Sequence, residues 1–285
     1  MGRAKRWLPA LIGILAAALV GCGQNIEEAA GRIAFETETA SPSDIMIMNG
    51  DGTEPQFVIS NGSEPSLRSD GRLIALIIEN NVYTVRTTGT GLFKVTDFGI
   101  GVGVRNPAIN PSGDRIAYVS EVTTLGAVPV IHIIGSDGTG DRILVTSGTE
   151  PAWSPDSLQI AFVRDPDIYT INLDGTNLTN QTNNGTGVIS TAPAFEPSGI
   201  RIAYTETPVV PSPIPSIRIV DLMSTEKTTL VVNGSHPTYR PDGMRFAFVR
   251  SGDIFSAKFD GTDVVQLTSG IADDKHPSWG FRPSD

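Results

Sequence analysis

Residues 150–172 read EPAWSPDSLQIAFVRDPDIYTIN, and this stretch decides the fold. It contains three short segments, at 150–153, 160–162 and 167–172, of which the last alternates between polar and apolar residues. This period of two, with β-branched and aromatic residues such as Ile160 and Phe162, is typical of β-strands. Ser154-Pro155-Asp156 separates the first two segments and is a turn sequence, because Pro presets its own φ and Asp bonds nearby backbone. The stretch therefore predicts short strands joined by tight turns.

The same unit recurs along the chain. Its first strand carries a Pro in six places, with spacings of 42, 44, 42, 44 and 40 residues: Pro65, Pro107, Pro151, Pro193, Pro237 and Pro277. Copies of Ile160-Ala161-Phe162 follow most of these prolines about ten residues later. A third alternating segment and a turn such as Asp174-Gly175-Thr176 then lead into a fourth strand. Four strands in a repeat of about 40–45 residues are typical of a β-propeller blade.

The two ends of the chain determine the number of blades. Ile33-Ala34-Phe35 opens the repeat region without a first strand before it, whereas the last repeat is a first strand alone, at 276–279. Together these fragments make one complete blade, so the chain holds six. We predict an all-β fold, a six-bladed β-propeller of four-stranded blades over residues 31–285. The C-terminal strand joins the N-terminal blade, which leaves no open sheet edge in the ring.

These repeats resemble the WD40-like β-propeller repeats of the TolB family. That family's consensus is similar to Pro-x-Trp-Ser-Pro-Asp-Gly-x-x-Ile-Ala-Phe, followed by Asp-Ile-Tyr and Asp-Gly-Thr. The resemblance covers essentially the whole chain after residue 30 and departs at 88–90 and 224–226, where Asp-Gly is replaced. It implies a TolB-like propeller without the additional N-terminal α/β domain of that family.

The first residues are typical of a targeting segment. Arg3, Lys5 and Arg6 precede an apolar run over 7–20, and Leu19-Val20-Gly21-Cys22 resembles the bacterial lipobox. The resemblance implies a lipoprotein signal peptide at 1–21, cleavage before Cys22, lipidation of Cys22 and a tether over 22–30. A membrane-spanning segment, or an ordinary secretory signal with an incidental Cys, is the alternative.

The predicted location follows from this anchor. It is the bacterial cell envelope: the outer membrane if one exists, because no Asp follows Cys22, and otherwise the outer face of the plasma membrane. We expect the propeller to be a monomer.

Composition excludes several kinds of site. The chain has 285 residues, a formal net charge of −10, one Cys and three His. A single Cys excludes a disulfide framework, a Cys-based zinc site and a Cys-x-x-Cys redox pair. An acidic chain without a basic stripe is not expected to bind nucleic acid. We predict no cofactor, leaving open a divalent cation.

The strand order predicts two different faces. Turns between first and second strands and between third and fourth strands share one face, where they are short. The other connections share the opposite face and include six long segments, at 37–43, 98–105, 120–129, 183–190, 205–215 and 269–275. Because binding residues concentrate on variable loops held by a rigid scaffold, we expect the functional face here. The alternative is that these loops are tolerated insertions.

The residues before the six prolines are candidates for ligand binding. If the first strand is innermost, they lie at the mouth of the central channel: Glu64, Asn106, Glu150, Ala192, His236 and His276. Asp273 and Asp274, just upstream of the last, would add negative charge. Carboxylates and imidazoles here could take a cation, a basic peptide end or a sugar. A solvated channel rim is the alternative, and we expect His132 to be structural.

Two other series recur with the repeats and suggest packing between blades rather than binding. The first is apolar and lies two residues after each Pro: Leu67, Ile109, Trp153, Phe195, Tyr239 and Trp279. The second consists of small residues that allow sheets to approach closely: Ala75, Ala117, Ala161, Ala203 and Ala247. A carbohydrate-stacking role for the aromatic members is the alternative.

The sequence favours a non-enzymatic function without excluding an enzyme. It has no Gly-x-Ser-x-Gly elbow, P-loop or His-Glu-x-x-His motif. We predict an exported, lipid-anchored binding or scaffold module whose loop-rich face takes a protein or a polysaccharide of the envelope. The alternative is a metal-dependent lyase or hydrolase acting on acidic sugars, with a metal held by His236, His276, Glu64 or Glu150.

Overall fold

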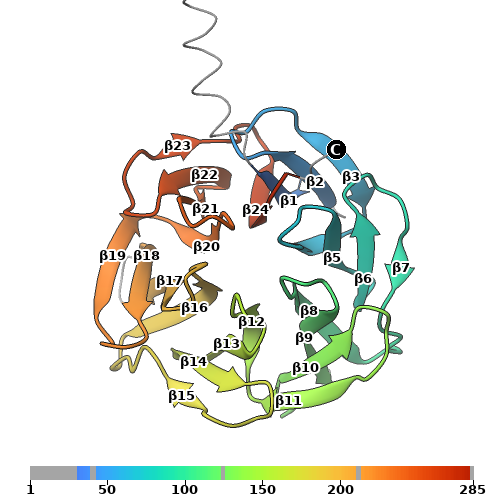
Figure 1. The fold of residues 1–285 in the computed structure, drawn as a ribbon, viewed down its shortest axis with the longest axis horizontal. Helices are drawn as coiled ribbons and strands as arrows, with labels where there is room; N and C mark the ends of the chain where they lie inside the picture. The colour runs from blue at the N-terminus through green and yellow to red at the C-terminus, as the bar shows by residue number, and fades with distance from the viewer. Residues whose placement is uncertain (1–30, 39–42, 123–125, 210–212, 283–285) are drawn as a thin grey trace, which may run out of the picture.

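The computed structural model describes residues 31–38, 43–122, 126–209 and 213–282. Within these ranges every regular element is a β-strand, and the strands form six four-stranded antiparallel sheets arranged around a central axis (Figure 1). This confirms the predicted six-bladed propeller. The predicted signal peptide, Cys22 and the tether lie outside the described residues. Among those that are described, no helix is long and apolar enough to cross a membrane.

The blades are numbered I to VI, and their strands are given from the axis outward. Blade I contains β24 (Asp273–Gly280), β1 (Arg32–Glu38), β2 (Asp44–Asn49) and β3 (Gln56–Ser60). Blade II contains β4 (Ser63–Leu67), β5 (Leu73–Ile78), β6 (Asn81–Arg86) and β7 (Phe93–Lys94). Blade III contains β8 (Val102–Ile109), β9 (Arg115–Val122), β10 (Val130–Gly135) and β11 (Arg142–Thr146).

The second half of the ring follows the same order. Blade IV contains β12 (Thr149–Trp153), β13 (Gln159–Arg164), β14 (Asp167–Asn172) and β15 (Thr179–Asn180). Blade V contains β16 (Val188–Phe195), β17 (Arg201–Pro208), β18 (Ser216–Asp221) and β19 (Lys227–Val232). Blade VI contains β20 (Ser235–Tyr239), β21 (Arg245–Arg250), β22 (Asp253–Lys258) and β23 (Val265–Gln266).

Closure of the ring occurs in blade I, as predicted. β24 pairs with β1 from Arg32 opposite Gly280 to Glu38 opposite Asp273. Directly after β24, the N–H of Phe281 donates to the Ser69 carbonyl of blade II at 2.6 Å. Hydrogen bonds therefore hold β24 against β1 and tie the residue after it to blade II, so that β24 completes blade I and covers the edge of β1.

Packing between neighbouring blades forms the core. The apolar series after the prolines is buried in every blade, and the repeated alanines are fully buried. One cluster joins Ala117 and Val119 of blade III to Trp153 and Ile160 of blade IV. The Trp153 indole also donates to the Ala108 carbonyl of blade III at 2.8 Å. Burial of one such side chain contributes about 1.5–3 kcal/mol, which explains why these positions repeat.

Blades of two kinds alternate around the ring. In blades I, III and V the innermost strand has 8 residues, whereas in blades II, IV and VI it has 5. The outermost strands alternate too, with 5, 5 and 6 residues against 2 in each of the other three. The structural repeat is thus a pair of blades, present three times.

This alternation corrects the predicted bounds of the long loops. Several residues assigned to loops lie in strands. In blades I, III and V the two innermost strands stay paired beyond the ends of the outer strands, and the last pairs are Glu38 with Asp273, Val122 with Val102, and Pro208 with Val188. The longer ladder satisfies backbone groups that a loop would leave to water. Three two-stranded projections result, here called the ribbons.

The connections that lead into the ribbons are held by one repeated contact. In blades II, IV and VI, a Thr lies just after the outermost strand. Its hydroxyl oxygen accepts a hydrogen bond from the N–H of the second residue of the neighbouring strand, the third from the axis. These bonds join Val82 to Thr96 at 2.9 Å, Ile168 to Thr182 at 3.0 Å and Ile254 to Thr268 at 2.9 Å. The base of each connection is therefore fixed, while its tip extends beyond the sheet.

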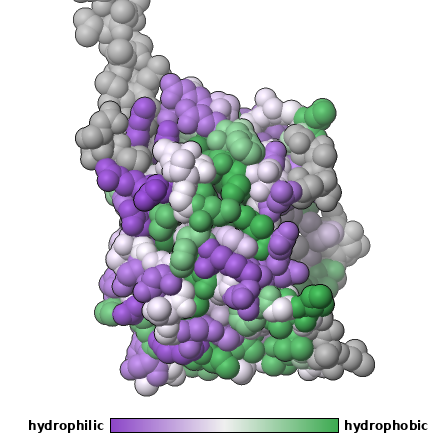
Figure 2. Space-filling model, turned by 90° about the vertical axis from the view of Figure 1, so that its right-hand side faces the viewer, coloured by the Kyte–Doolittle hydropathy of each residue, from purple (hydrophilic) through white to green (hydrophobic). Residues whose placement is uncertain are grey.

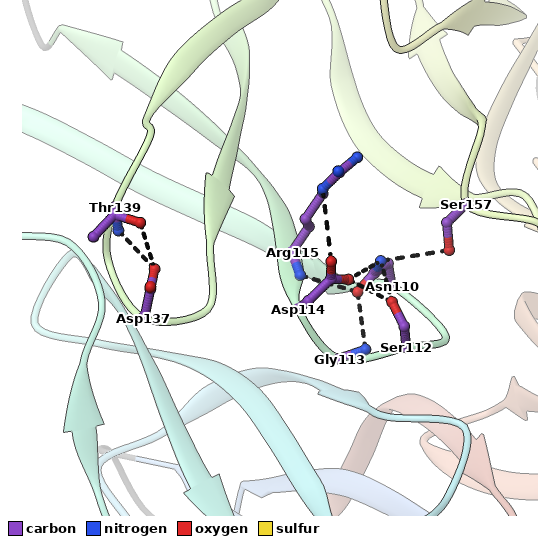
Figure 3. A network of polar contacts seen from close by, with 8 residues as sticks. All are labelled: Asn110, Ser112, Gly113, Asp114, Arg115, Asp137, Thr139 and Ser157. Carbon is purple, nitrogen blue, oxygen red and sulfur yellow. Dashed lines mark hydrogen bonds and ion pairs between the residues drawn. The ribbon is translucent and has the colours of Figure 1, made fainter.

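The opposite face carries only short turns and is called the tight-turn face. In Figure 3, the Asp137 carboxylate accepts the Thr139 N–H at 3.0 Å and the Thr139 hydroxyl at 2.7 Å. The Asn110 side chain braces the neighbouring turn, accepting the N–H groups of Gly113 and Arg115, each at 3.0 Å. The Asp-Gly-Thr turns were predicted, and their side chains close them as expected.

The outer wall of the ring shows no single dominant chemistry on the side drawn in Figure 2. Figure 2 views the side that carries β7 in Figure 1 and shows hydrophobic side chains interspersed with hydrophilic ones. Scattered apolar residues are ordinary on a protein surface. We therefore look for the functional site along the axis and on the two faces.

Candidate functional site

A cavity of about 510 Å³ lies along the axis of the ring. It is lined by the six innermost strands, and all six residues that precede the repeated prolines contribute to it: Glu64, Asn106, Glu150, Ala192, His236 and His276. Glu64, Glu150 and His236 are the second residues of their short strands, whereas the other three lie in the middle of the long strands, where the ribbons begin. The face that carries the ribbons is here called the loop-rich face. These six are called the ring residues, and the end of the cavity that they surround is the channel mouth. The structure therefore brings these candidates together as predicted.

The ring residues share an unusual backbone conformation. All six have positive φ, from 48° at Ala192 to 52° at His236. The register of the innermost strand shifts at this point; in blade IV, for example, Thr149 pairs with Val163 and Ala152 with Ala161, which leaves Glu150 and Pro151 unpaired. Left-handed backbone at a residue other than Gly is uncommon and costs free energy, so its recurrence in every blade marks the mouth as a special part of the fold.

The bulges present ring N–H groups to side chains of the preceding blade. The N–H of Glu64 donates to Glu36 Oε2 at 3.0 Å, and that of Ala192 donates to Glu150 Oε2 at 2.5 Å. The N–H of Asn106 donates to Glu64, and that of His236 donates to the Thr205 hydroxyl at 2.9 Å. Two of the ring carboxylates therefore satisfy the backbone of the next blade, which couples neighbouring blades around the mouth.

Glu36 was missed by the sequence analysis. It lies on β1 beside the mouth, where its Oε2 is 3.0 Å from Nδ1 of His276. A signal was present, because the residue after each Ile-Ala-Phe motif is apolar in four repeats and polar in two, at Glu36 and Thr205. Both polar residues accept a ring N–H, so the exceptions in the repeat mark contacts of the mouth.

The two mouth histidines have opposite protonation tendencies. Their rings are 5.4 Å apart and nearly perpendicular. Burial, reinforced by the neighbouring His276, lowers the pKa of His236 to about 4. Burial would also lower the pKa of His276, but its hydrogen bond to Glu36 and the nearby carboxylates outweigh this and raise it. At neutral pH the mouth therefore holds His236 in its neutral form beside a more basic His276.

The carboxyl groups of the mouth differ in the same way. Burial alone would raise the pKa of Glu36, but the hydrogen bonds from His276 and from the Glu64 N–H lower it to about 2. Burial raises the pKa of both Glu64 and Glu150, despite the N–H groups that each accepts. The mouth thus offers one firmly ionised carboxylate and two whose charge is less well solvated, an arrangement that favours a cationic or hydrogen-bond-donating ligand.

The remaining candidates lie elsewhere. Asp273 and Asp274 start β24 and are not among the residues that line the cavity; Asp274 is buried, and its N–H donates to the Gly252 carbonyl at 2.7 Å. His132 stacks on Tyr118 with ring centroids 4.9 Å apart and lies 3.2 Å from Asp141, within blade III. Among the described residues, no three His, Cys, Asp or Glu side chains are grouped so that they could hold a metal ion.

Comparison with known proteins identifies the fold. No protein-family model matches the chain. The structure is similar to TolB from Acinetobacter baumannii, at a TM-score of 0.75 and 19% identity over 96% of this chain and 74% of that one. A putative TolB from Agrobacterium tumefaciens matches at 0.67 and 18% identity, over 90% of this chain and 100% of that one.

A further similar structure belongs to an enzyme. Oligogalacturonate lyase from Vibrio parahaemolyticus matches at a TM-score of 0.59 and 11% identity, over 82% of this chain and 73% of that one. At these identities the likeness concerns the fold alone, because one propeller fold hosts many functions. The resemblance to TolB-type propellers that the repeats predicted is confirmed at the level of fold.

Proposed function

We propose that this chain is a non-enzymatic binding module that recognises a protein, or alternatively an envelope polymer, through its loop-rich face. The observation that carries the proposal is the difference between the faces. Three ribbons surround an acidic channel mouth on one face, whereas short, internally bonded turns form the other. Variable segments on a rigid scaffold are where proteins place recognition.

The chemistry of the loop-rich face supports a protein partner. Ile100 and Ile271, at the tips of two connections between blades, are fully exposed, at 110% and 106% of the reference area. Val122, Val128 and Val209, at or beside the ribbon ends, are also exposed. Apolar tips around an acidic mouth suit a partner that places an apolar surface on the ribbons and a basic group over Glu64 and Glu150, the carboxyl groups that line the cavity.

The protein is also proposed to have a defined cellular location. We infer that Cys22 is lipidated after removal of residues 1–21 and that residues 22–30 tether a monomeric propeller to the bacterial cell envelope. The lipobox-like residues before Cys22 support this, as does the TolB-type fold of the rest of the chain. The membrane is the outer membrane if one exists, and otherwise the plasma membrane at its outer face. Two or more acyl chains would make the anchor stable.

The experiment compares two pairs of substitutions in the full chain. The first pair, Ile100→Ser with Ile271→Ser, changes the loop-rich face. The control pair, Leu158→Ser with Met223→Ser, removes apolar side chains of 64% and 84% exposure from the tight-turn face. All four are surface positions, so stability should change by less than about 0.5 kcal/mol each.

The readout is recovery of partners from detergent-solubilised envelope of the native host. We expect proteins captured by the unmodified chain to be lost with the first pair and retained with the control pair. Equal recovery with both pairs would reject the loop-rich face as the recognition surface.

No specific observation favours the alternative of a metal-dependent lyase or hydrolase acting on acidic sugars. Its support is the fold shared with the lyase at 11% identity. The carboxylates of Glu36, Glu64 and Glu150 would repel an acidic sugar unless a cation lay between them. Metal analysis of the purified protein, with melting temperatures measured in added Mn²⁺, Zn²⁺ and Ca²⁺, tests it. A bound divalent ion would revive the alternative.

A further inference from the structure

A second cavity lies on the tight-turn face, between blades I and II. Its volume is about 510 Å³, and five arginines line it: Arg32, Arg68, Arg72, Arg86 and Arg282. The chain has only 21 Lys and Arg residues and a net charge of −10, so nearly a quarter of its cations gather at one place. Among the residues that line this cavity, all in the described part of the chain, none is Asp or Glu. It is called the arginine pocket.

Closure of the ring assembles the arginine pocket. Arg32 is the first residue of β1, Arg86 is the last of β6, and Arg282 follows β24. Arg68 and Arg72 flank the turn whose Ser69 carbonyl accepts the N–H of Phe281. The N–H of Thr87 also donates to the Arg72 carbonyl at 3.1 Å. These backbone bonds hold the bases of the arginines in place, so their grouping is a property of the fold rather than of loose chain ends.

The charges favour a multivalent anion. Arg68 is paired with Asp70, a residue beside the pocket, through Nε and Oδ1 at 2.6 Å. The same carboxylate also interacts with Arg72. The guanidinium groups of Arg32, Arg86 and Arg282 share the cavity with these two, and the like charges repel each other there. A guanidinium presents a planar fork of donors that matches a phosphate group, and the exposed Thr88 hydroxyl adds a neutral hydrogen-bonding group at the rim.

The position of the pocket indicates where such an anion would come from. Gly31, directly before Arg32, lies on the tight-turn face, where its carbonyl accepts the Gly50 N–H at 3.0 Å. Residues 1–30 therefore join the propeller beside the pocket. If Cys22 is lipidated, as proposed above, residues 22–30 can span at most about 30 Å even when fully extended. The tether would then hold the tight-turn face, with the arginine pocket, next to the membrane.

We propose that the arginine pocket binds the phosphate of an anionic phospholipid headgroup. This inference rests on the proposed anchor and adds an orientation to it: the tight-turn face lies on the membrane and the loop-rich face points away. The contact has to be local, because the other turns of this face carry carboxylates such as Asp137, Asp174 and Asp260. Arginines close to a bilayer surface are attracted by its anionic lipids within about one Debye length.

The test uses the lipidated protein, purified from membranes and reconstituted in vesicles. Cys22 is the only Cys, so one added Cys can carry a fluorophore after Cys22 is acylated. Thr90→Cys places the probe on the tight-turn face beside the pocket, and Thr186→Cys places it on the loop-rich face. Lipids with a quencher in the headgroup report contact with the bilayer, in phosphatidylcholine vesicles with and without phosphatidylglycerol. Flotation of the protein with neutral vesicles tests the anchor separately.

Matched charge variants make the result specific to the pocket. Arg32→Gln with Arg282→Gln removes two charges from it, whereas Arg115→Gln with Arg142→Gln removes two charges from the same face at blade III. We expect phosphatidylglycerol to increase quenching at Thr90→Cys about threefold and leave Thr186→Cys unchanged. The pocket variant should lose this increase and the blade III variant should keep it. Equal quenching in neutral and anionic vesicles, or loss with both variants, would overturn the proposal.

Inorganic phosphate distinguishes the two sources of the same chemistry. If phosphate binds the protein without vesicles and abolishes the quenching, the pocket takes free phosphate and the lipid assignment is wrong. If the unmodified protein fails to float with neutral vesicles, the anchor fails. Flotation with anionic vesicles then tests the pocket. Binding that disappears only in the pocket variant supports the proposal, and an absence of binding by the unmodified protein overturns it.

Discussion

The two faces of this propeller are made by the same strands and differ in how the strands are connected. On the tight-turn face, a Cβ added at Gly261 would lie 2.2 Å from the Leu230 carbonyl oxygen of the preceding blade. On the loop-rich face, a Cβ at Gly126 or Gly185 would meet no atom within 4 Å. The turns at Gly52, Gly89 and Gly138 also approach a carbonyl of the preceding blade, although the turn at Gly175 does not. Most turns of the tight-turn face are therefore part of the packing between blades, whereas these two tips of the loop-rich face are free to vary without disturbing it.

This difference separates folding from recognition. Turns that interlock neighbouring blades restrict what residues they can hold, so the tight-turn face is an unsuitable place for variable binding segments. The ribbons rise above the packed part of the ring, and the connections that lead into them are fixed at their bases by contacts such as Thr182 with Ile168. The channel mouth combines features of both faces: its backbone is fixed by packing between blades, and its side chains are polar and line the cavity.

The largest expected effect on stability comes from removing β24, the strand that closes the ring on which both faces are built. A chain ending at Ala272 lacks β24 and exposes the edge of β1. We expect this truncation to abolish cooperative unfolding, a loss comparable to the whole stability of about 5–15 kcal/mol, measured by thermal melting followed by near-ultraviolet circular dichroism. A chain ending at Arg282 retains β24 and serves as the control. A cooperative melt of the shorter chain at an unchanged temperature would refute the closed ring.

A smaller loss of stability is expected from substitutions in the turns, and it should differ between turns that pack against the preceding blade and turns that do not. Gly261 and Gly175 occupy the same kind of turn with φ of +82° and +83°, but a Cβ at Gly175 would meet no atom within 4 Å. Gly175→Ala should cost about 1 kcal/mol for the left-handed backbone alone. Gly261→Ala should cost about 2–4 kcal/mol, because the Leu230 carbonyl must also move. Chemical denaturation measures both, and equal losses would show that the turns do not interlock the blades.

A third prediction concerns pH at the channel mouth. With a pKa of about 4 in the folded protein against 6.5 for an ordinary His, His236 stays neutral at pH 5 while the unfolded chain takes up a proton. Stability therefore falls as the pH drops from about 7 toward 4, and His236→Asn should remove about 2 kcal/mol of the loss between pH 7.5 and pH 5.

The neighbouring His276 provides the control with the opposite sign. Its pKa is raised in the folded protein, so its contribution is present below pH 6.5 and is lost as the pH rises through the raised value. His276→Gln should make the loss on acidification larger instead of smaller. Parallel pH profiles for the two variants, measured by chemical denaturation, would contradict the assigned protonation states.

The fold could be predicted because each blade of a propeller corresponds to one sequence repeat of nearly constant length. The spacing of Pro151 from Pro107 and Pro193 fixes the blade length, and the unpaired copies at Ile33 and His276 fix the closure. The alternation of long and short blades was not predicted, because it depends on how far two strands stay paired at their ends. Periodicity alone does not determine that point.

The site could be predicted only in part, for a related reason. The ring residues occupy equivalent positions of the repeat, so the fold brings them together once its symmetry is known. Glu36 was missed because it belongs to a different strand of the repeat, and the pair it forms with His276 joins residues 240 positions apart. The arginine pocket has no repeat signal at all, since Arg32, Arg86 and Arg282 meet only because the ring closes.

The central claim is that a protein partner is recognised on the loop-rich face and not on the tight-turn face. Photo-cross-linking in intact cells tests it most directly, with a photoreactive amino acid introduced singly at Ile100, Ile271, Leu158 or Met223. The account predicts adducts with a protein partner from Ile100 and Ile271 and none from Leu158 and Met223. Protein adducts from Leu158 or Met223, with none from the two isoleucines, would contradict it.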